Sequence, residues 1–439
     1  MFEDISTRRV FLQKGLTLLA LAPTVPSFLD QTVMAMANPQ DLARTQGASG
    51  KDGKILVVIQ LSGGNDGLNM VVPYADDAYH KARPAIRHEP NTVHKINDYV
   101  GLHPNLAPLK ELYDDGRMAV VQGVGYPNPN RSHFRSMDIW HSAQPDKDVV
   151  TNGWLGRYFD NSCAGCDPHV GVAIGDQMPL AMKGDRIQPL SFDRPETYRY
   201  NGKDKDRYLK LNKVESGEVA SAQPSVEVPQ VAAIAKPRKN QIVSSDAQLD
   251  FLHRTAMDAQ LSSDDIGRMT ARHAGAQYPG TQFGNGLRTV AAMIAGGLPT
   301  RVYYVALSGF DTHAGERGRH DNLMTQLAQG ISAFSKDLKQ QGNAERVMMI
   351  TFSEFGRRVE QNASGGTDHG AAAPMFVIGP KLKSGVLGKH PSLTDLDAGD
   401  LKHTVDFRSI YATVLQSWLD TPSKPILGNQ FPLLPILKA

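Results

Sequence analysis

The sequence predicts an α/β domain in which a mostly parallel central sheet carries helices on both faces. Two short apolar runs, at 54–61 (KILVVIQL) and 118–124, enclose an amphipathic stretch at 104–115 that is followed by Gly116. Short β-branched runs of this kind indicate buried parallel strands, and the order strand, helix, strand is typical of a parallel sheet. The same alternation returns near the C-terminus, so we expect both ends of the chain to contribute to one sheet.

The C-terminal part supplies the remaining elements of this sheet. We expect further strands at 301–307, 346–352 and 374–378, and helices at 286–297, 318–341 and 407–419. Residues 246–276 are polar and amphipathic, which also favours a helix. Residues 202–242 are rich in Lys, Ser, Val, Pro and Gln without a clear period, which is typical of a surface insertion. We therefore predict one domain at 38–439 with a variable insertion at about 180–285.

The N-terminus has the order of an export signal. Arg8-Arg9 is followed by Phe11-Leu12, by an apolar stretch at 16–22 and by Ala35-Met36-Ala37. This order is typical of twin-arginine signals, although an arginine pair also arises by chance in basic segments. The apolar stretch is too short to span a bilayer. We expect the twin-arginine translocase, which carries folded proteins, to export the chain and residues 1–37 to be removed. The product would be periplasmic or secreted, without a stable transmembrane anchor.

Composition narrows the class of protein. The 439 residues hold 47 Lys and Arg against 45 Asp and Glu, so there is no basic field of the kind that nucleic-acid binding needs. Nucleic acid is therefore not an expected partner. The two cysteines, Cys163 and Cys166, form a Cys-x-x-Cys motif. In an oxidising compartment a local disulfide is favoured, and a redox or metal role is the alternative.

Acidic and histidine residues stand at the ends of several predicted strands. Because the carboxyl ends of parallel strands share one edge of a sheet, we expect these side chains to converge. Carboxylates and imidazoles together suit Zn²⁺, with Mg²⁺, Ca²⁺ or Mn²⁺ as alternatives, and two such ions would clamp an anionic oxygen. Each residue also has a structural interpretation, as a helix cap, a turn residue or a hydrogen-bonded strand-end histidine. The candidate ligands are Asp66, Asp311, His313, Glu354, Asp368 and His369.

Five strings of residues occur in order along the chain. They are LSGGNDGLN (61–69), NPNRSHFRSMDIWH (128–141), LSGFDTHAGE (307–316), TFSEFGRR (351–358) and GTDHG (366–370). Together they resemble a bacterial family of twin-arginine-exported proteins of unknown function, placed in the alkaline phosphatase superfamily with the sulfatases. The resemblance implies an alkaline phosphatase-like α/β sandwich and covers nearly the whole chain after the signal.

The resemblance also implies roles for individual residues. Asp66 resembles the aspartate that binds one metal beside the nucleophile, and Ser132 resembles the nucleophile itself. Asp311 and His313 resemble ligands of the other metal. His369, which precedes a strand that begins with a proline, resembles the last histidine ligand.

The chain departs from the superfamily pattern at three places. Asp311 and His313 are two residues apart, whereas alkaline phosphatases usually use a wider spacing. Glu354 stands where the superfamily has the aspartate of an Asp-His pair, but Phe355 follows it in place of the histidine. One metal then lacks a ligand unless another residue replaces it, the candidates being Asp368, His320 and His133. No proline follows Ser132 as a formylglycine sulfatase signature requires, which disfavours that chemistry.

Ser132 has two compatible interpretations. It can cap the helix that runs toward Trp140. The same helix N-terminus would stabilise a phosphoryl or sulfuryl group over its hydroxyl, with Arg131 and Arg135 as bidentate donors to the anion.

These features predict an exported metal-dependent hydrolase of phosphate or sulfate esters with Ser132 as the nucleophile. Its substrate would be an anionic ester, either a small molecule or a polysaccharide. The alternative is a non-catalytic exported binding or assembly protein on a degenerate phosphatase-like fold, which the Phe355 departure favours. A metal-free serine hydrolase is disfavoured because the sequence has no G-x-S-x-G motif.

The export prediction rests on the arginine pair. Replacing Arg8 and Arg9 with lysine should leave unprocessed precursor in the cytoplasm, which immunoblotting of cell fractions would detect. Mature protein in the periplasm at the wild-type level would show that the signal is of another kind.

Overall fold

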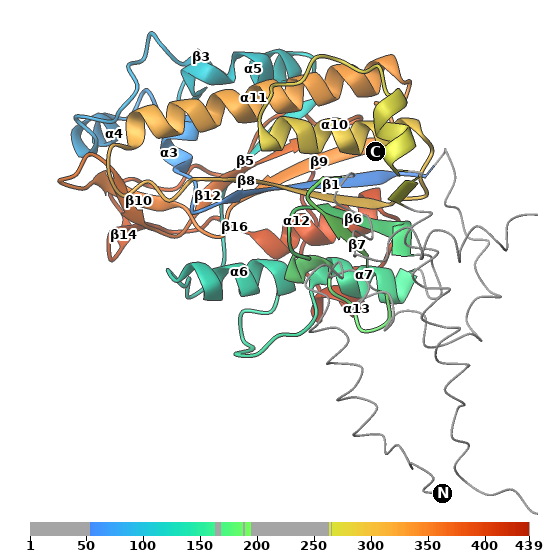
Figure 1. Ribbon diagram of the computed structural model, residues 1–439. Coiled ribbons are helices and arrows are strands. Elements are labelled where there is room, and N and C mark those ends of the chain that lie inside the picture. Colours follow the sequence, from blue (N-terminus) through green and yellow to red (C-terminus); the bar gives the residue numbers. More distant parts are fainter. Residues whose placement is uncertain (1–52, 163–167, 188, 195–262, 265, 439) are drawn as a thin grey trace, which may run out of the picture. The chain divides into compact units, whose positions relative to one another are not determined.

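The computed structural model describes residues 53–162, 168–187, 189–194, 263–264 and 266–438 (Figure 1). Apart from residues 263 and 264, these belong to one compact unit formed by Ala37–Thr197 and Ile266–Ala439, and this unit contains the sheet and the candidate site. The predicted signal at 1–37, both cysteines and most of the predicted insertion lie outside the described residues. Among the described helices, none is both long and apolar enough to cross a bilayer.

Nine of the described strands form one sheet. Their order is β13–β5–β12–β9–β1–β8–β6–β7, and β16 also pairs with β5. Every pairing is parallel except those of β12, which runs antiparallel to both β5 and β9. The predicted mostly parallel sheet is confirmed. The strands are β1 Ile55–Ser62, β5 Met118–Gly125, β6 Gly171–Ile174, β7 Leu190–Phe192, β8 Val302–Ser308, β9 Val347–Phe352, β12 Ala373–Ile378, β13 Gly385–Leu387 and β16 Val405–Asp406.

The reversed direction of β12 matters for the candidate site. In a parallel sheet, side chains that follow the strands gather at the carboxyl edge. Because β12 is antiparallel, the residues that precede it reach this same edge. His369 therefore lies close to the residues that follow β1, β8 and β9, although it comes before its strand in the sequence.

The helices cover both faces of the sheet (Figure 1). One face carries α5 (Ala107–Asp114), α10 (Gln282–Ala295) and α11 (Glu316–Gln340), and the other carries α6 (His133–Ser142), α7 (Trp154–Ser162), α12 (Phe407–Thr413) and α13 (Lys424–Leu427). The crossovers that contain α5 and α11 both move along the sheet toward β5, whereas the crossover that contains α6 and α7 moves from β5 toward β6. Right-handed connections then require the two groups to lie on opposite faces.

The predicted helices agree with the observed ones. The helix expected at 407–419 is α12 continued by a π-helical turn, Val414–Trp418. Of the helix expected at 246–276, residues 263–264 and 266–272 are described and helical, residues 273–276 are described and not helical, and the rest lies outside the described residues. β7 and the first turn of α10 fall within 180–285, so the sheet and its covering layer extend into the range assigned to the insertion.

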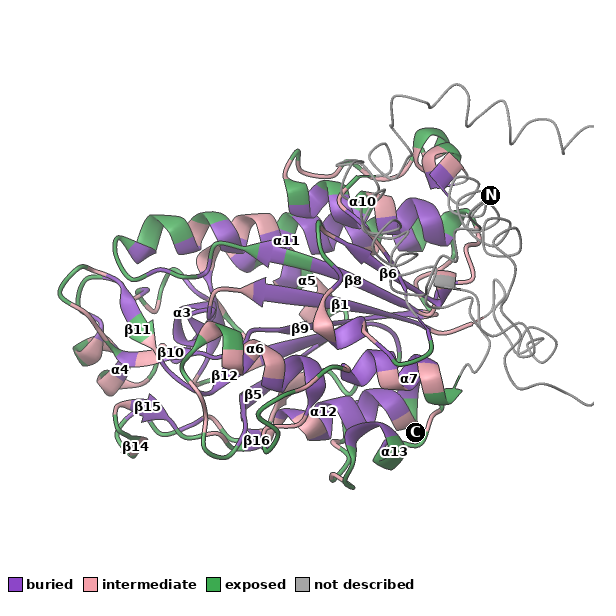
Figure 2. Ribbon diagram, turned by 60° about the horizontal axis from the view of Figure 1, so that its bottom comes forward, coloured by how far each residue is buried: buried purple, intermediate pink, exposed green. Residues whose placement is uncertain are grey.

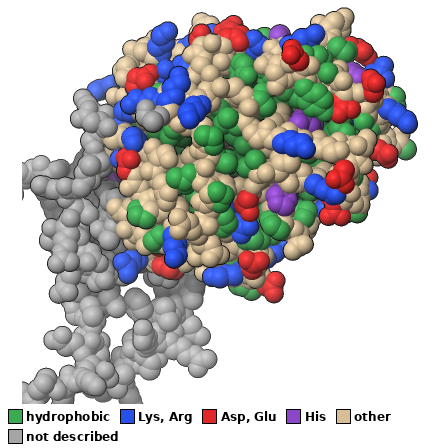
Figure 3. Space-filling model, turned by 180° about the vertical axis from the view of Figure 1, so that it is seen from behind, with side chains coloured by type: hydrophobic (Ala, Val, Ile, Leu, Met, Phe, Trp, Pro, Cys, Tyr) green, Lys and Arg blue, Asp and Glu red, His purple; other side chains and the backbone are tan. Residues whose placement is uncertain are grey.

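The core lies between the sheet and its helices, and the sheet is buried over most of its length (Figure 2). On the α12 face, the ring of Trp140 stacks on Phe407 at 4.4 Å and that of Trp154 on Tyr411 at 4.2 Å. On the face of the molecule shown in Figure 3, acidic and basic side chains are interspersed, as the balanced composition predicts.

The loops that leave the main sheet contain short antiparallel strand pairs. β2 (Val71–Val72), β4 (Gly101–Leu102) and β3 (His94–Lys95) form one small sheet. Two hairpin-like pairs follow, β10 (Arg357–Gln361) with β11 (Thr367–His369) and β14 (Leu396–Asp397) with β15 (Asp400–Leu401). These pairings fix the loops that carry the candidate site.

Candidate metal centre

Four side chains from three loops converge at the carboxyl edge of the sheet. Asp311 and His313 follow β8, His369 ends β11, and His133 begins α6. The Nε2 atoms of His313 and His369 lie 3.0 Å apart, and Asp311 Oδ1 lies 3.1 Å from the first and 3.2 Å from the second. His133 Nε2 lies 3.6 Å from Asp311 Oδ2. Ligand atoms of His133, Asp311 and His369 all lie within 4.8 Å of one another.

The hydrogen bonds of Nδ1 determine which nitrogen of each ring carries the proton. His369 Nδ1 lies 2.9 Å from the carbonyl oxygen of Arg131. A carbonyl only accepts, so we assign the proton to Nδ1 and the lone pair to Nε2. His313 Nδ1 lies 3.3 Å from Asp368 Oδ1, and an ionised carboxylate likewise only accepts.

Glu354 orients His133 in the same way. His133 Nδ1 lies 2.9 Å from Glu354 Oε1, which also accepts the amide hydrogen of Gly63 at 2.8 Å. The Glu354 side chain is almost fully buried at the end of β9, and the hydroxyl of Ser353 donates to its other oxygen. Glu354 is thus fixed by two donors of its own and presents one face to the imidazole. His133 is left with its lone pair on Nε2.

This donor set fits a divalent cation. The Nε2 atoms of His313 and His369 lie within 3.2 Å of each other and of Asp311 Oδ1, so a cation bound by the two imidazoles and this carboxylate would hold the three groups together. Around a tetrahedral Zn²⁺ with Zn–N bonds of about 2.0–2.1 Å, ligand atoms stand roughly 3.3 Å apart. The three distances among Asp311, His313 and His369 are close to this value. Oxygen acceptors on the outer nitrogens, as in Glu354 and Asp368, are the usual support of such ligands.

Arg357 ties the loops of the centre together. Its guanidinium is fully buried and donates to the carbonyls of Gly63, Gly64, Phe310 and Thr367 and to Asp311 Oδ1 at 2.8 Å. Burial alone would raise the pKa of Asp311, but the hydrogen bond from the Arg357 guanidinium lowers this pKa to about 2. Asp311 is therefore ionised at neutral pH. The sequence analysis missed Arg357, because nothing in TFSEFGRR distinguishes it from the partly exposed Arg358.

Phe355 forms an apolar floor beneath the histidines. Its ring lies 4.5 Å from that of His369 and 4.8 Å from that of His133. Gly64 is required here: its φ is +77°, and a Cβ atom would lie 2.3 Å from the Phe355 ring. The Gly-Gly of the first string thus lets the chain pass under this ring.

Asp66 lies in a different, buried environment. It precedes the short helix α3 (Gly67–Met70) without a side-chain capping bond, and it is not among the described side chains that converge on the centre. Its Oδ2 forms a 2.5 Å ion pair with Arg83 Nη1, and neither side chain is exposed. Burial alone would raise the pKa of Asp66, but Arg83 holds it below its ordinary value.

Glu316 completes this buried set. Its Oε2 accepts the hydroxyls of Thr312 and Thr367, while its Oε1 and Asp66 Oδ1 have no other donor. Burial, together with the adjacent charge of Asp66, raises the pKa of Glu316 to about 9. A protonated Glu316 that donates to Asp66 accounts for both oxygens. Neither Glu316 nor Arg83 was among the predicted site residues: Glu316 ends the string LSGFDTHAGE without a predicted role, and Arg83 lies outside all five strings.

Ser132 lies between two residues of the centre. It occupies the N-cap position of α6, is exposed, and makes no side-chain capping bond. The carbonyl of the preceding Arg131 holds His369, and the following residue is His133. The two arginine side chains have other partners: Nη2 and Nε of Arg131 both contact Asp400 Oδ2, at 2.6 and 2.7 Å, and Arg135 donates to the carbonyl of Pro145.

A second set of metal-type side chains is buried elsewhere. Ligand atoms of His88, His103 and Asp321 lie within 4.8 Å of one another. The amide of Asn105 donates to His103 Nδ1, so His103 Nε2 carries the proton that it gives to Asp321 at 2.8 Å. With both ring nitrogens of His103 committed, this set offers fewer ligands than the centre at Asp311.

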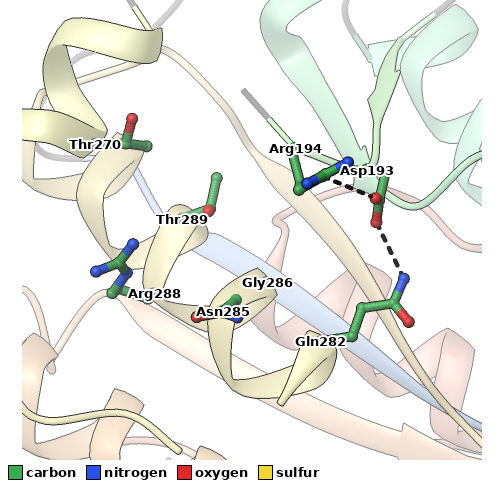
Figure 4. Close-up of a pocket in the computed structure, with 8 residues that line it drawn as sticks. All are labelled: Asp193, Arg194, Thr270, Gln282, Asn285, Gly286, Arg288 and Thr289. Atoms are coloured by element: carbon green, nitrogen blue, oxygen red, sulfur yellow. Dashed lines mark hydrogen bonds and ion pairs between the residues drawn. The ribbon is translucent and has the colours of Figure 1, made fainter. Parts of the chain in front are cut away.

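Two larger cavities lie among the described residues. One of about 410 Å³ runs along α10 and contains no histidine among its described lining residues (Figure 4). The one carboxylate among those lining residues, Asp193, already accepts from Gln282 and pairs with Arg194. A second cavity, of about 310 Å³, is lined by Phe355, whose ring also contacts His369, but none of the four converging side chains is among its described lining residues.

The sequence matches one known protein family over residues 118–419. This chain belongs to that family, described as a protein of unknown function (DUF1501). The matched stretch of this DUF1501 protein contains Ser132 and all four converging side chains, whereas Asp66 and Arg83 lie before it. No curated protein matches the sequence.

Solved structures similar to this DUF1501 protein share little sequence with it. A protein in the alkaline phosphatase superfamily from Vibrio parahaemolyticus is 9% identical over 91% of this chain and 75% of that one, with a TM-score of 0.36. The PsFucS1 sulfatase from Pseudoalteromonas sp. is 10% identical over 91% and 73%, with a TM-score of 0.37. The C-terminal periplasmic domain of EcEptC from Escherichia coli, in complex with Zn, is 9% identical over 76% and 74%, with a TM-score of 0.33.

The buried carboxyl pair predicts how stability depends on pH. Because the pKa of Glu316 is raised on folding, its contribution is complete below its ordinary pKa and is lost as pH rises toward about 9. Glu316→Gln mimics the protonated acid and should remove this loss, which amounts to at most about 1.4 kcal/mol per pH unit. Urea unfolding at pH 6 and pH 9 would measure it.

The control is Glu345→Gln, whose side chain is exposed and pairs with Arg117. This variant should keep the wild-type difference between pH 6 and pH 9. If Glu316→Gln keeps it too, Glu316 is ionised in the folded protein and the shared proton does not exist.

Proposed function

We propose that this protein is an exported hydrolase of phosphate or sulfate esters that works with a divalent cation, Zn²⁺ in the first place. Asp311, His313 and His369 would hold the cation. The observation that carries the proposal is that the Nε2 atoms of His313 and His369 lie 3.0 Å apart and that Asp311 Oδ1 lies 3.1 and 3.2 Å from them. Mixed imidazole and carboxylate ligands favour Zn²⁺ over the harder cations. Such an ion supplies Lewis acidity toward an ester oxygen.

Ser132 would be the nucleophile. Its hydroxyl makes no helix-capping bond. The residue before it, Arg131, contacts His369 Nδ1 through its carbonyl, and the residue after it is His133 of the centre. The N-terminus of α6, a helix of ten residues, favours the negative charge of a phosphoryl or sulfuryl group. Attack by Oγ on phosphorus or sulfur would break the ester bond, release the alcohol and leave an ester on Ser132 that water then hydrolyses.

The roles of the other predicted residues follow from their contacts. Glu354 and Asp368 would orient His133 and His313 rather than bind the ion themselves. Because the Arg131 side chain is paired with Asp400, the amide hydrogens of the first turn of α6 are the better donors to a bound anion. The cavity beside Phe355 offers space for the remainder of the ester, whether a small molecule or part of a polysaccharide.

The metal proposal predicts the metal content of the purified protein. Protein exported through its native route should contain a divalent cation, and Asp311→Asn or His313→Ala should lose it, because each removes one of three close ligands. His80→Ala, at a half-buried histidine whose Nε2 contacts the carbonyl of Tyr74, is the control and should keep the ion. Elemental analysis of the folded variants decides. Equal metal content in all four proteins would contradict the proposal.

The nucleophile proposal predicts a separation of activity from folding. Ser132→Ala should bind metal as the wild type does but lose hydrolysis of an aryl phosphate or aryl sulfate by several orders of magnitude. Its stability should change little, since the hydroxyl makes no capping bond. If metal-loaded wild type hydrolyses neither ester, and Ser132→Ala only unfolds at a lower temperature, the non-catalytic alternative is the better one.

A further inference from the structure

The superfamily resemblance implies two metals, but the residues for the second one are engaged otherwise. Asp66 would be a ligand of that metal, with Glu354 and a histidine in the place of Phe355. In this chain the Phe355 ring packs beneath the histidines, and Glu354 accepts hydrogen bonds from Gly63 and His133. The second ligand set is therefore incomplete.

A side-chain cation already neutralises Asp66. The Arg83 guanidinium pairs with Asp66 Oδ2 through Nη1 and donates to the carbonyls of Val359 through Nε and Arg358 through Nη2. Each of its three nitrogens therefore has a partner. Asp66 Oδ1 and Glu316 Oε1 are buried without any other donor, so one proton shared between the two carboxyl groups satisfies both. Asp66, Arg83 and Glu316 are each at most 1% exposed, and together they are electrically balanced. A divalent cation added there would leave uncompensated charge in a buried site, which is costly.

Glu354, which the superfamily pattern assigns to the second metal, supports the first metal site in this chain. His133, held by Glu354, directs its Nε2 toward Asp311 at 3.6 Å. Glu354 therefore acts indirectly: it positions the imidazole of His133, which would be the fourth donor beside Asp311, His313 and His369. Ligand atoms of His133, Asp311 and His369 lie within 4.8 Å of one another, so an ion held by Asp311, His313 and His369 could take His133 as the fourth ligand that a tetrahedral ion needs.

We propose that the chain holds one divalent cation, with His133 as the fourth ligand and Glu354 as a positioning residue, and that Arg83 stands in place of a second metal. This inference rests on the proposed metal function but concerns the number of ions and the ligand set. It predicts that the centre cannot clamp a substrate between two ions, so the N-terminus of α6 must supply the second positive pole.

The test is a count of bound ions. Mature protein is stripped with a chelator and titrated with Zn²⁺, and native mass spectrometry counts the ions per chain while calorimetry gives the affinity. We expect one ion in the wild type. Glu354→Gln should lower the affinity by roughly 10- to 100-fold, as loss of an outer-layer partner does. His133→Ala should lower it further, and His80→Ala should not change it.

The variant Asp66→Asn distinguishes a centre with one ion from a centre with two ions, in which Asp66 would be a ligand. If Asp66 takes no part in metal binding, this variant should keep one ion at the wild-type affinity, although it breaks a buried ion pair and should be less stable. Since the ion count on wild type needs no variant, poor folding of Asp66→Asn would not weaken the test. The visible absorption of the Co²⁺-substituted protein gives a second readout, because four-coordinate Co²⁺ absorbs far more strongly than six-coordinate Co²⁺, and His133→Ala should alter it.

The outcomes are distinct. Two ions per chain, or an Asp66→Asn affinity as low as that of His133→Ala, would overturn the single-ion inference even if esters are hydrolysed. If the wild type binds one ion and His133→Ala binds it with unchanged affinity, His133 is not a ligand and that part of the inference is wrong. One ion with the expected losses but no ester turnover would leave this inference standing and contradict the proposed hydrolase. Absence of any Zn²⁺ binding would contradict both.

Discussion

The buried guanidinium of Arg357 is the contact on which the candidate centre depends. It donates to carbonyls from the loops after β1, β8 and β10, and to the Asp311 carboxylate. A buried charge of this kind is tolerated only when all its donors are used. The loops that carry Asp311 and His369 are therefore fixed to each other through one residue that itself reaches neither solvent nor substrate.

This constraint also explains the glycines of the first string. Gly63 and Gly64 both present carbonyls to Arg357, and both have positive φ. A Cβ on Gly63 would lie 2.5 Å from the amide nitrogen of Asp311. The backbone must approach this closely for the guanidinium to reach several loops at once, so the Gly-Gly pair and Arg357 are parts of one arrangement.

Much of the fold could be predicted from the sequence, because it rests on local patterns. The apolar runs at 54–61, 118–124 and 346–352 became buried strands, and their order implied a parallel sheet whose carboxyl edge gathers Asp311 and His313. The antiparallel direction of β12 had no signal in its own residues. It follows from pairing across the sheet, which is a non-local property.

The sequence predicted which residue types gather at the candidate site, but not which of the carboxylates lies beside the histidines and which is buried in an ion pair. Asp66 and Asp311 look alike in the sequence, each following a strand and a glycine-rich turn. What separates them is the partner that burial brings to each: Arg83 reaches Asp66 in a place closed to solvent, whereas Asp311 keeps half of its side-chain surface exposed beside three imidazoles. Arg83, Glu316 and Arg357 were not among the predicted ligands, and only the folded chain shows that Arg83 and Glu316 contact Asp66 while Arg357 contacts Asp311.

The way in which the centre is assembled bears on the proposed route of export. His133 begins α6 just after the supporting acceptor Arg131, Asp311 and His313 follow β8, His369 ends β11, and the supporting acceptor Glu354 follows β9. Ligands so far apart in the sequence meet only after the sheet and both helix layers have formed. Because an ion bound to the native state alone adds to its stability, loading and folding would be coupled. A twin-arginine signal, which suits proteins that are already folded, would allow this centre to form and take up its ion in the cytoplasm, before the chain meets the metals available outside.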